Sequence, residues 1–325
     1  MTVLVTGGTG GIGRAVIQLL LDNGVRPRVV TRRPHRALEC FDDRVTAFEW
    51  HPRTQALPAP AVDGVERIIH LMGEPLLGPV SRARRARIQS SRSGGIQLVA
   101  EALSRPIHFI AASSALVYGF GAGPPVSETS TVRPPKDKLA RALIACEEAT
   151  EAVRASGSVV TVVRLGHLIG EGEDGLVQTL TRLHRRGITW RDAPADAVVP
   201  VIDAEDAAAL IAHLALSPPV SGPVHAVAPM PLASAALKQE LQKASGRTRF
   251  AALPRLALKP HLGALADSLY NRQQIVPQRA LDAGFVFRHA DPLESIRAAL
   301  QPPAGAAPAM GRMAVLASML KRSRG

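Results

Sequence analysis

The stretch VLVTGGTGGIG, residues 3–13, decides the fold of this chain. An apolar strand pattern runs into a glycine-rich loop, and the residues after the loop predict a helix. In this arrangement Gly7 permits a sharp turn, Gly10 lets the backbone approach a ligand, and Gly13 lets the helix pack on the sheet. The free amides at the start of such a helix attract a diphosphate, so the stretch predicts a dinucleotide site. A glycine-rich turn without a ligand is the alternative.

The end of the second predicted strand indicates which dinucleotide is bound. It reads VVTRRPHR, residues 29–36, and it has no acidic side chain to hold a ribose 2′-hydroxyl. Thr31, Arg32 and Arg33 stand there instead, and guanidinium groups bind a 2′-phosphate through charge-assisted hydrogen bonds. We therefore expect NADP(H) rather than NAD(H), although a solvated loop in an arginine-rich chain would look the same.

Strands and helices alternate along the first half of the chain. The strand patterns lie at residues 2–6, 28–31, 45–50, 65–71, 107–112 and 159–165. Helical patterns at residues 81–104 and 136–155 separate the last three strands. This alternation predicts an α/β fold with a doubly wound, parallel Rossmann sheet. The rhythm then changes. We expect a nucleotide-binding domain at residues 1–166 to which later segments return, a smaller C-terminal α/β substrate lobe at 167–301, and a disordered basic tail at 302–325.

Composition argues against several classes of protein. The 46% of hydrophobic residues suits a buried core, and Cys40 and Cys146 lack the spacing of metal ligands. No apolar run reaches the roughly 18 residues of a membrane helix and no leader precedes the first strand, so we expect a cytoplasmic protein. The net charge of +12 is spread along the chain, without a basic segment interleaved with aromatic residues. We therefore expect a small-molecule substrate rather than nucleic acid or a membrane as the partner.

Several segments resemble those of the extended short-chain dehydrogenases/reductases, and among them the atypical "epimerase family" of NAD(P)-binding proteins. The segments are VLVTGGTGGIG, IIHLMGEPL, RARRARIQSSRSGGIQLVAEAL, SSALVYG, VVRLGHLIG, VVPVIDAEDAAALI, GPVHAVAP and QIVPQRALDAGFVF. They span nearly the whole chain. The resemblance implies a Rossmann domain and a smaller lobe over the nicotinamide end of the cofactor. Relatives often pair through their long helices, which makes a homodimer the assembly to test.

Cofactor contacts are expected at the carboxyl ends of the first, second and fourth strands, where an open parallel sheet binds its ligands. In the segment HLMGEP, Gly73 would let the backbone approach the nicotinamide ribose closely. The expected cofactor-binding residues are Thr6, Gly7, Gly10, Gly11, Ile12, Gly13, Thr31, Arg32, Arg33, Leu71, Met72 and Gly73.

One family feature is missing. Extended members carry Y-x-x-x-K on the helix after the fifth strand, where the lysine lowers the pKa of the tyrosine so that it can exchange a proton. The corresponding helix here reads DKLARALIACEEA and has no tyrosine. The sequence holds two tyrosines, Tyr118 and Tyr270, and the residues four positions later are Ala122 and Gln274. The usual acid/base pair is therefore absent, which weakens any transfer of sugar epimerase or dehydratase activity.

The remaining candidate catalytic groups follow three of the strands. Ser113 and Ser114 can hydrogen-bond a carbonyl or hydroxyl group of a substrate, or they can simply cap the fifth strand. Tyr118 can face the ligand as a hydrogen-bond donor, or it can form an amphipathic wall. Glu74 could act as a base if burial raised its pKa, or it could be a solvated loop carboxylate. His167 could exchange protons near pH 7, or it could be a spacer.

Other charged groups can be explained by a structural role as well as by a functional one. An arginine-rich helix could grip an anionic substrate or a cofactor phosphate, but it could equally be a solvated basic face. Its arginines are Arg82, Arg84, Arg85, Arg87 and Arg92. We expect His70 to be a satisfied core histidine, and Asp203 or Asp206 to cap the helix that follows.

The sequence therefore supports a leading hypothesis and two alternatives. The leading one is an NADP(H)-dependent hydride-transfer oxidoreductase acting on an unidentified carbonyl or hydroxyl compound. The first alternative is a non-catalytic NADP(H)-dependent binding or sensing protein, which would keep the glycine loop and lose the acid/base pair. The second is a nucleotide-sugar epimerase or dehydratase with an unusual base.

Overall fold

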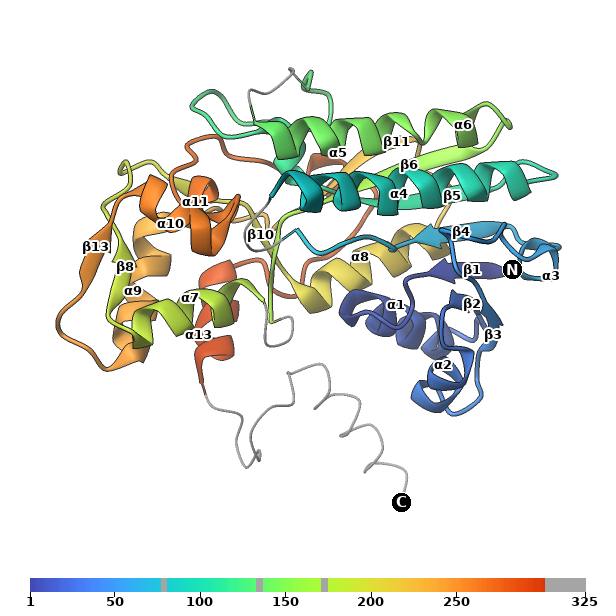
Figure 1. The fold of residues 1–325 in the computed structure, drawn as a ribbon, viewed down its shortest axis with the longest axis horizontal. Coiled ribbons are helices and arrows are strands. Elements are labelled where there is room, and N and C mark those ends of the chain that lie inside the picture. Colours follow the sequence, from blue (N-terminus) through green and yellow to red (C-terminus); the bar gives the residue numbers. More distant parts are fainter. Residues whose placement is uncertain (77–80, 133–136, 171–174, 302–325) are drawn as a thin grey trace.

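The computed structural model describes residues 1–76, 81–132, 137–170 and 175–301, and the whole course of the chain is drawn in Figure 1. Strands and helices alternate around one large sheet, and a smaller group of helices and short strands lies beside it. The tail expected at residues 302–325 lies outside the described residues.

The large sheet has seven strands in the order β11-β6-β5-β4-β1-β2-β3, and every neighbouring pair is parallel. Its strands are β1 (Val3–Thr6), β2 (Arg28–Thr31), β3 (Thr46–Glu49), β4 (Arg67–His70), β5 (His108–Ser114), β6 (Val159–Leu165) and β11 (Gly222–Ala226). The chain runs outward from β1 to β3 and then restarts on the other side of β1 with β4. A doubly wound sheet binds its ligand at this switch point, outside the carboxyl ends of the strands. The Rossmann fold expected from the sequence is confirmed.

Helices cover both faces of the sheet, which explains why its strands are almost continuously apolar. On one face, α1 (Gly11–Asp22) packs against α8 (Ala204–Leu216). On the other face lie α4 (Arg82–Ala102), α5 (Lys138–Glu148) and α6 (Glu151–Arg154), seen above the sheet in Figure 1. The small helices α2 (Pro34–Cys40) and α3 (Ala59–Val62) complete the β2–β4 side.

The smaller lobe has its own apolar core, formed by side chains that include Leu180, Trp190, Leu237, Leu241 and Ile296. Its helices are α7 (Leu176–Arg185), α9 (Ser234–Ser245), α10 (Arg255–Leu262), α11 (Leu265–Ser268) and α13 (Pro292–Leu300), while α12 (Gln278–Asp282) lies against β11. Three two-stranded pairs link these parts: β7 (His167–Ile169) with β10 (Val201–Asp203), β9 (Val198–Val199) with β12 (Leu232–Ala233), and β8 (Ile188–Trp190) with β13 (Ala251–Leu253).

Some predicted elements are interrupted for local reasons. The helix expected over residues 136–155 ends with α5, because the carbonyl of Glu147 accepts from the Thr150 hydroxyl and from its amide in a tight turn. The apolar run VVPVI, residues 198–202, has the pattern of one strand but forms parts of two, β9 and β10, because Pro200 between them has no N–H to donate to a ladder. Gly263, with φ of +58°, separates α10 from α11. Within the described residues, no helix is both long and apolar enough to cross a membrane.

Candidate functional site

The glycine loop has the stereochemistry that a bound diphosphate requires. Gly7 has φ of +71°, and a Cβ there would lie 2.8 Å from the backbone carbon of Leu71. A Cβ on Gly13 would lie 2.3 Å from the carbonyl oxygen of Gly7, and the Gly10 amide donates to the same oxygen at 3.1 Å. Any larger residue at position 7 or 13 would therefore displace backbone rather than a flexible side chain.

The N-terminus of α1 opens directly from this loop and is left for a ligand to cap. Gly10 is its N-cap residue, no side chain caps the helix, and its first turn contains no acidic residue. Helix amides that lack partners attract negative charge, and Leu71 and Met72, which follow β4, lie against the loop. The loop residues present, Gly7 to Gly13, thus fit the diphosphate of a dinucleotide.

The predicted cofactor residues meet at the same edge of the sheet. Thr6 stands in register with Val30 on one side and His70 on the other, so the ends of β1, β2 and β4 lie together. The side chain of Thr6 is fully buried, and its Oγ1 is 3.1 Å from His70 Nδ1. Thr6 can therefore offer a ligand only its backbone. His70 lies in the core as expected, but only its Nδ1 is bonded, and its Nε2 has no hydrogen-bond partner among the described residues, so it is not fully satisfied.

The arginines at the end of β2 have no acidic partners in the part of the chain that the structure describes. Arg32, Arg33 and Arg36 are exposed, and none of them forms an ion pair with a described residue. The Thr31 hydroxyl accepts from the Arg33 amide at 3.3 Å. The carboxylate nearest in register, Glu49 opposite Thr31 on β3, is bonded to a histidine. These free guanidiniums can hold a phosphate on the adenosine ribose.

A row of polar side chains crosses the other end of the sheet. Ser113 on β5, Arg164 on β6 and His225 on β11 are in register with one another. Side chains in register on parallel strands point to the same face, here the face covered by α5. Glu147 on α5 and Tyr118, in the 3₁₀ turn Ala115–Tyr118 that follows β5, meet this row.

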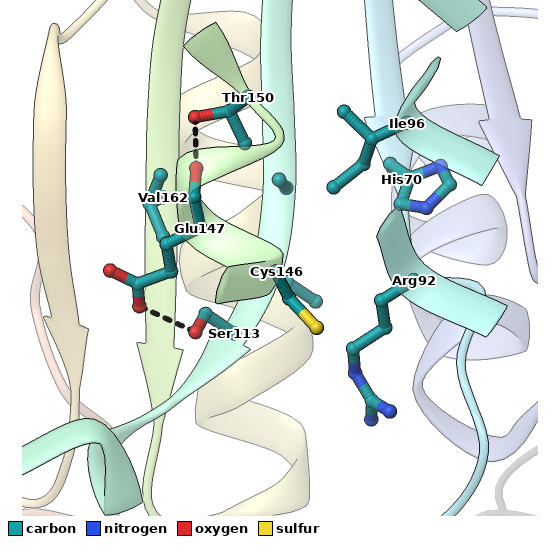
Figure 2. A pocket seen from close by; sticks show the side chains of 10 residues that line it. His70, Arg92, Ile96, Ser113, Cys146, Glu147, Thr150 and Val162 are labelled. Carbon is teal, nitrogen blue, oxygen red and sulfur yellow. Dashed lines mark hydrogen bonds between the residues drawn. The ribbon is translucent and has the colours of Figure 1, made fainter. Parts of the chain in front are cut away.

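A nearly buried ion pair anchors the row. The Arg164 guanidinium donates to both oxygens of Glu147, with Nε to Oε1 at 3.0 Å and Nη2 to Oε2 at 2.6 Å. The Ser113 hydroxyl donates to Glu147 Oε1 at 2.5 Å, as Figure 2 shows. The Ser113 hydroxyl is thus committed to Glu147, on the side of the strand that faces α5.

Tyr118 joins this ion pair to His225. Its hydroxyl accepts from Arg164 Nη1 at 2.6 Å and lies 2.7 Å from His225 Nε2. His225 Nδ1 must donate to the carbonyl oxygen of Val276, 2.8 Å away, so Nε2 accepts the proton of Tyr118 in the neutral ring. Burial raises the pKa of Tyr118 despite the charge of Arg164, and burial lowers the pKa of His225. Near neutral pH this pair is a phenol and a neutral imidazole, not a phenolate base.

Glu128 supports the row of polar side chains through the backbone of β11. Its Oε1 accepts from the backbone amides of His225 at 2.9 Å and Arg279 at 3.2 Å, so it joins β11 to the segment around α12. Its Oε2 is buried without a hydrogen-bond partner among the described residues. Glu128 therefore fixes the backbone that positions the His225 ring.

The part of α5 that precedes Glu147 presents an apolar face to Tyr118. Leu139 and Leu143, one helical turn apart, are buried against Ile88, Leu116 and Val117. A lysine on this face would have to bury its ammonium group in a hydrocarbon cluster. The absence of the acid/base pair from the sequence is thus accompanied by a packed apolar surface beside Tyr118.

The other candidate catalytic residues lie apart from the row or are engaged elsewhere. Ser114 is buried, donates to the Leu165 carbonyl at 3.4 Å and accepts from the Leu116 amide. His167 Nε2 is 2.8 Å from the Ser268 hydroxyl in the smaller lobe, and burial lowers the pKa of His167 to about 4. It is therefore neutral near pH 7, where the sequence had suggested that it could exchange protons.

Three acidic candidates have structural partners. Glu74 lies 3.6 Å from Arg87 Nη2 on α4, and its backbone amide donates to the Ser91 hydroxyl. Asp203 caps α8 by accepting from the Glu205 amide. Asp206 accepts instead from two backbone amides near residue 288.

Sequence reasoning did not find Glu147, Arg164, His225 or Glu128. The signal for two of them was present, because Arg164 and His225 each interrupt an otherwise apolar strand in VVTVVRL and GPVHA. A charged or polar residue at a core position needs a partner. Which residue supplies that partner depends on strand register and on the placement of α5.

Three comparisons place this geometry among known proteins. Residues 3–225 match the model of the NAD dependent epimerase/dehydratase family. The Arabidopsis thaliana protein named "Epimerase family protein SDR39U1 homolog, chloroplastic" is 26% identical over 325 residues, which is 93% of this chain and 87% of the relative. The Homo sapiens "Epimerase family protein SDR39U1" is 27% identical over 88% of this chain and 95% of its own length.

Solved structures share the fold. The crystal structure of human SDR39U1 with NADPH matches with a TM-score of 0.75 at 24% identity, over 92% of this chain and 99% of that one. The UDP-glucuronic acid 4-epimerase from Bacillus cereus, in complex with UDP-glucuronic acid and NAD, matches with a TM-score of 0.70 at 16% identity over 92% and 99%. At these identities the structural likeness establishes the fold alone.

Proposed function

The chain belongs to the NAD dependent epimerase/dehydratase family, and from this premise we propose that it is an NADP(H)-dependent oxidoreductase. It would transfer hydride between the nicotinamide ring and a carbonyl or hydroxyl group of a small molecule. The observation that carries the proposal is the glycine loop at the uncapped start of α1, flanked at the end of β2 by arginines without acidic partners among the described residues. The human relative whose structure contains NADPH supports the choice of cofactor.

The residues of this chain would bind and orient, while the bound cofactor would supply the hydride. The loop from Gly7 to Gly13 would hold the diphosphate, and Arg32 and Arg33 the 2′-phosphate. We assign Tyr118 to shaping the substrate side of the crevice rather than to proton transfer, because burial raises its pKa and its hydroxyl is already bonded to Arg164 and His225. The side chains of Leu139 and Leu143 lie beside it where a lysine would be needed to lower that pKa.

Isothermal titration calorimetry with NADPH and NADH tests the cofactor assignment. We expect the wild type to bind NADPH at least about tenfold more tightly, since charge-assisted hydrogen bonds contribute about 1.5–3 kcal/mol. The double variant Arg32→Ala/Arg33→Ala should lose this preference. Arg26→Ala, an exposed arginine before β2 that bonds the Asp43 carbonyl, is the matched control and should keep it. Absence of heat with either cofactor would refute the proposal.

Turnover is tested separately, by following NADPH oxidation with a panel of carbonyl compounds and by determining which hydrogen of the nicotinamide is transferred. The packed apolar face of α5 favours one alternative, a protein that binds NADP(H) as a sensor without catalysis. Tight NADPH binding with no turnover across the panel, together with a partner protein bound only in the presence of cofactor, would select that alternative.

Two further parts of the proposal concern setting and assembly. The structure contains two free thiols, an exposed one at Cys40 and a buried one at Cys146, which fits a reducing compartment, and we propose the cytoplasm.

We also propose a homodimer, as expected for a chain with this resemblance. Light scattering on the purified protein would measure its mass, and a monomer at micromolar concentration would exclude the dimer.

A further inference from the structure

Arg92 of α4 lies against the loop that follows β4. A Cβ added to Gly73 would be 2.6 Å from Arg92 Cζ and 2.9 Å from its Nε, so the guanidinium rests on bare backbone. One and two residues earlier in the same loop, Met72 and Leu71 are the backbone that abuts Gly7. Arg92 is therefore a near neighbour of the glycine loop, although it comes from a helix on the opposite face of the sheet.

This guanidinium has little to bond with inside the protein. Its one hydrogen bond among the described residues runs from Nη1 to the Ile88 carbonyl, at a long 3.4 Å, in its own helix. No described carboxylate lies within 4 Å of it, since Glu74 is beside Arg87 and Glu147 is held by Arg164. Burial lowers the pKa of Arg92, because nearby charges do not make up for lost solvation. An arginine has five N–H donors, and most of them are unused here.

The pocket beside Arg92 contains a second unsatisfied group. It lies between α4 and α5 over the sheet, and its lining includes His70, Ser113, Cys146 and Glu147. His70 is 1% exposed, and its Nε2 has no hydrogen-bond partner among the described residues. Figure 2 shows the Arg92 side chain pointing away from the His70 ring, towards the end of β5 where Ser113 lies. That end of the strands faces the ligand crevice.

We propose that Arg92 binds an oxyanion of the ligand, a phosphate or carboxylate group, at the β4–β5 side of the crevice. The planar guanidinium matches such a group bidentately, and the anion would supply the counter-charge that the described protein lacks. This proposal rests on the proposed function, because it takes the crevice to hold NADP(H) and its substrate. The oxyanion has two sources, the diphosphate of the cofactor or an acidic substrate.

Stability distinguishes this role from a structural one. Arg92→Gln removes a half-buried charge that has no counter-ion among the described residues, so the free protein should melt at the same temperature or a higher one. If Arg92 instead held the fold together, the substitution would lower the melting temperature. Arg92→Lys serves as the second variant, because it keeps the positive charge but loses the planar guanidinium that can bind an oxyanion bidentately.

Calorimetry and thermal shift with two probes identify the source of the oxyanion. If it is the cofactor, Arg92→Gln weakens NADPH binding about 10- to 100-fold, and Arg92→Lys weakens it less. If it is the substrate, NADPH binding is unchanged, and inorganic phosphate raises the melting temperature of the NADPH-loaded wild type but not of loaded Arg92→Gln. Arg82→Gln, an exposed arginine on the same helix, is the control for general charge and should follow the wild type.

The proposal is overturned if Arg92→Gln matches the wild type with both probes, or if the substitution lowers the melting temperature of the free protein. Failure of the proposed function has a different signature, because the wild type itself would then bind no NADPH. In that case a phosphate titration of the free protein still tests Arg92, and phosphate stabilisation that disappears in Arg92→Gln would support the oxyanion site alone.

Discussion

The two ends of the sheet's carboxyl edge are built in opposite ways. At the β1–β2–β4 end, the fit to a ligand comes from backbone: Gly7 and Gly13 leave no room for side chains, and the start of α1 is uncapped. At the β5–β6–β11 end, it comes from side chains that bond one another, with the Arg164–Glu147 ion pair at the centre.

This difference predicts different sensitivities. The glycine loop depends on close backbone contacts, within the loop itself and with Leu71 and Met72, so it fails when an atom is added. The polar row depends on residues up to 107 positions apart, as in the Tyr118–His225 bond, so it fails when an atom is removed. A buried group whose partner is deleted loses both solvent and hydrogen bond. The following substitutions, from the largest expected effect to the smallest, test this contrast.

Gly13→Ala should have the largest effect on cofactor binding. The added methyl would lie 2.3 Å from the Gly7 carbonyl oxygen, so the loop must move, and we expect NADPH affinity to fall by more than about 100-fold. Gly94→Ala on α4 is the matched control, because a Cβ there meets nothing within 4 Å. It should raise the free energy of unfolding by about 0.5–1 kcal/mol. Calorimetry and urea denaturation measure both, and equal NADPH affinities in the two variants would contradict the backbone account.

Glu147→Gln should destabilise the protein strongly without touching the glycine loop. The side chains of Arg164 and Glu147 are 9% and 15% exposed, and the substitution leaves Arg164 nearly buried without a counter-charge. We expect a loss of about 3–5 kcal/mol in the free energy of unfolding. Its exposed neighbour provides the control, and Glu148→Gln should change stability by less than about 0.5 kcal/mol. A similar small change in both variants would show that the ion pair does not anchor the row.

Mild acid should destabilise the fold through buried histidines. Burial lowers the pKa of His70 and of His108 to about 4, below the unfolded value of about 6.5. The unfolded chain therefore binds more protons between these values, and stability that is present above pH 6.5 is lost as the pH falls towards 4. Each histidine contributes a slope of up to about 1.4 kcal/mol per pH unit.

The variant His70→Asn, whose amide can keep the bond to Thr6, should reduce the slope of stability against pH. The reduction is at most about 1.4 kcal/mol per pH unit, the contribution of one proton. His35→Asn, at an exposed position, should leave the slope unchanged. Urea denaturation between pH 7.5 and 4.5 measures the slopes. A slope for His70→Asn as steep as that of the wild type would mean that His70 is not the group that titrates.

Tyr118→Phe should have the smallest effect of the four. It leaves Arg164 Nη1 and His225 Nε2 without their shared hydroxyl, which costs about 1–3 kcal/mol. Tyr270→Phe, which loses an exposed bond to the Arg191 carbonyl, should cost less than about 1 kcal/mol. Any NADPH-dependent turnover should fall less than about tenfold in Tyr118→Phe, since general acid–base catalysis by a side chain contributes about 10²–10⁴-fold. A loss in that larger range would make Tyr118 the proton donor after all.

By itself, the sequence determined the Rossmann fold and the glycine loop that we propose binds the nucleotide. A strand, a glycine loop and a helix are local patterns, and the steric demands of Gly10 and Gly13 follow from neighbours within a few residues. The demand at Gly7 also depends on the distant backbone of Leu71 and Met72. The sequence also determined what is missing, because neither Tyr118 nor Tyr270 precedes a lysine by four residues.

Only the tertiary structure decided what the remaining polar groups do. Ser113 looked free to meet a substrate until α5 brought Glu147 to its hydroxyl, and Tyr118 had no visible partner until β11 brought His225 beside it. In the sequence Arg92 was one of several arginines on a basic helix, and only the structure shows that its guanidinium packs against the backbone of Gly73. The physical reason is that strand register and helix placement bring these groups together across 34 to 107 residues of chain. A local sequence pattern does not show which acceptor a buried donor will bond.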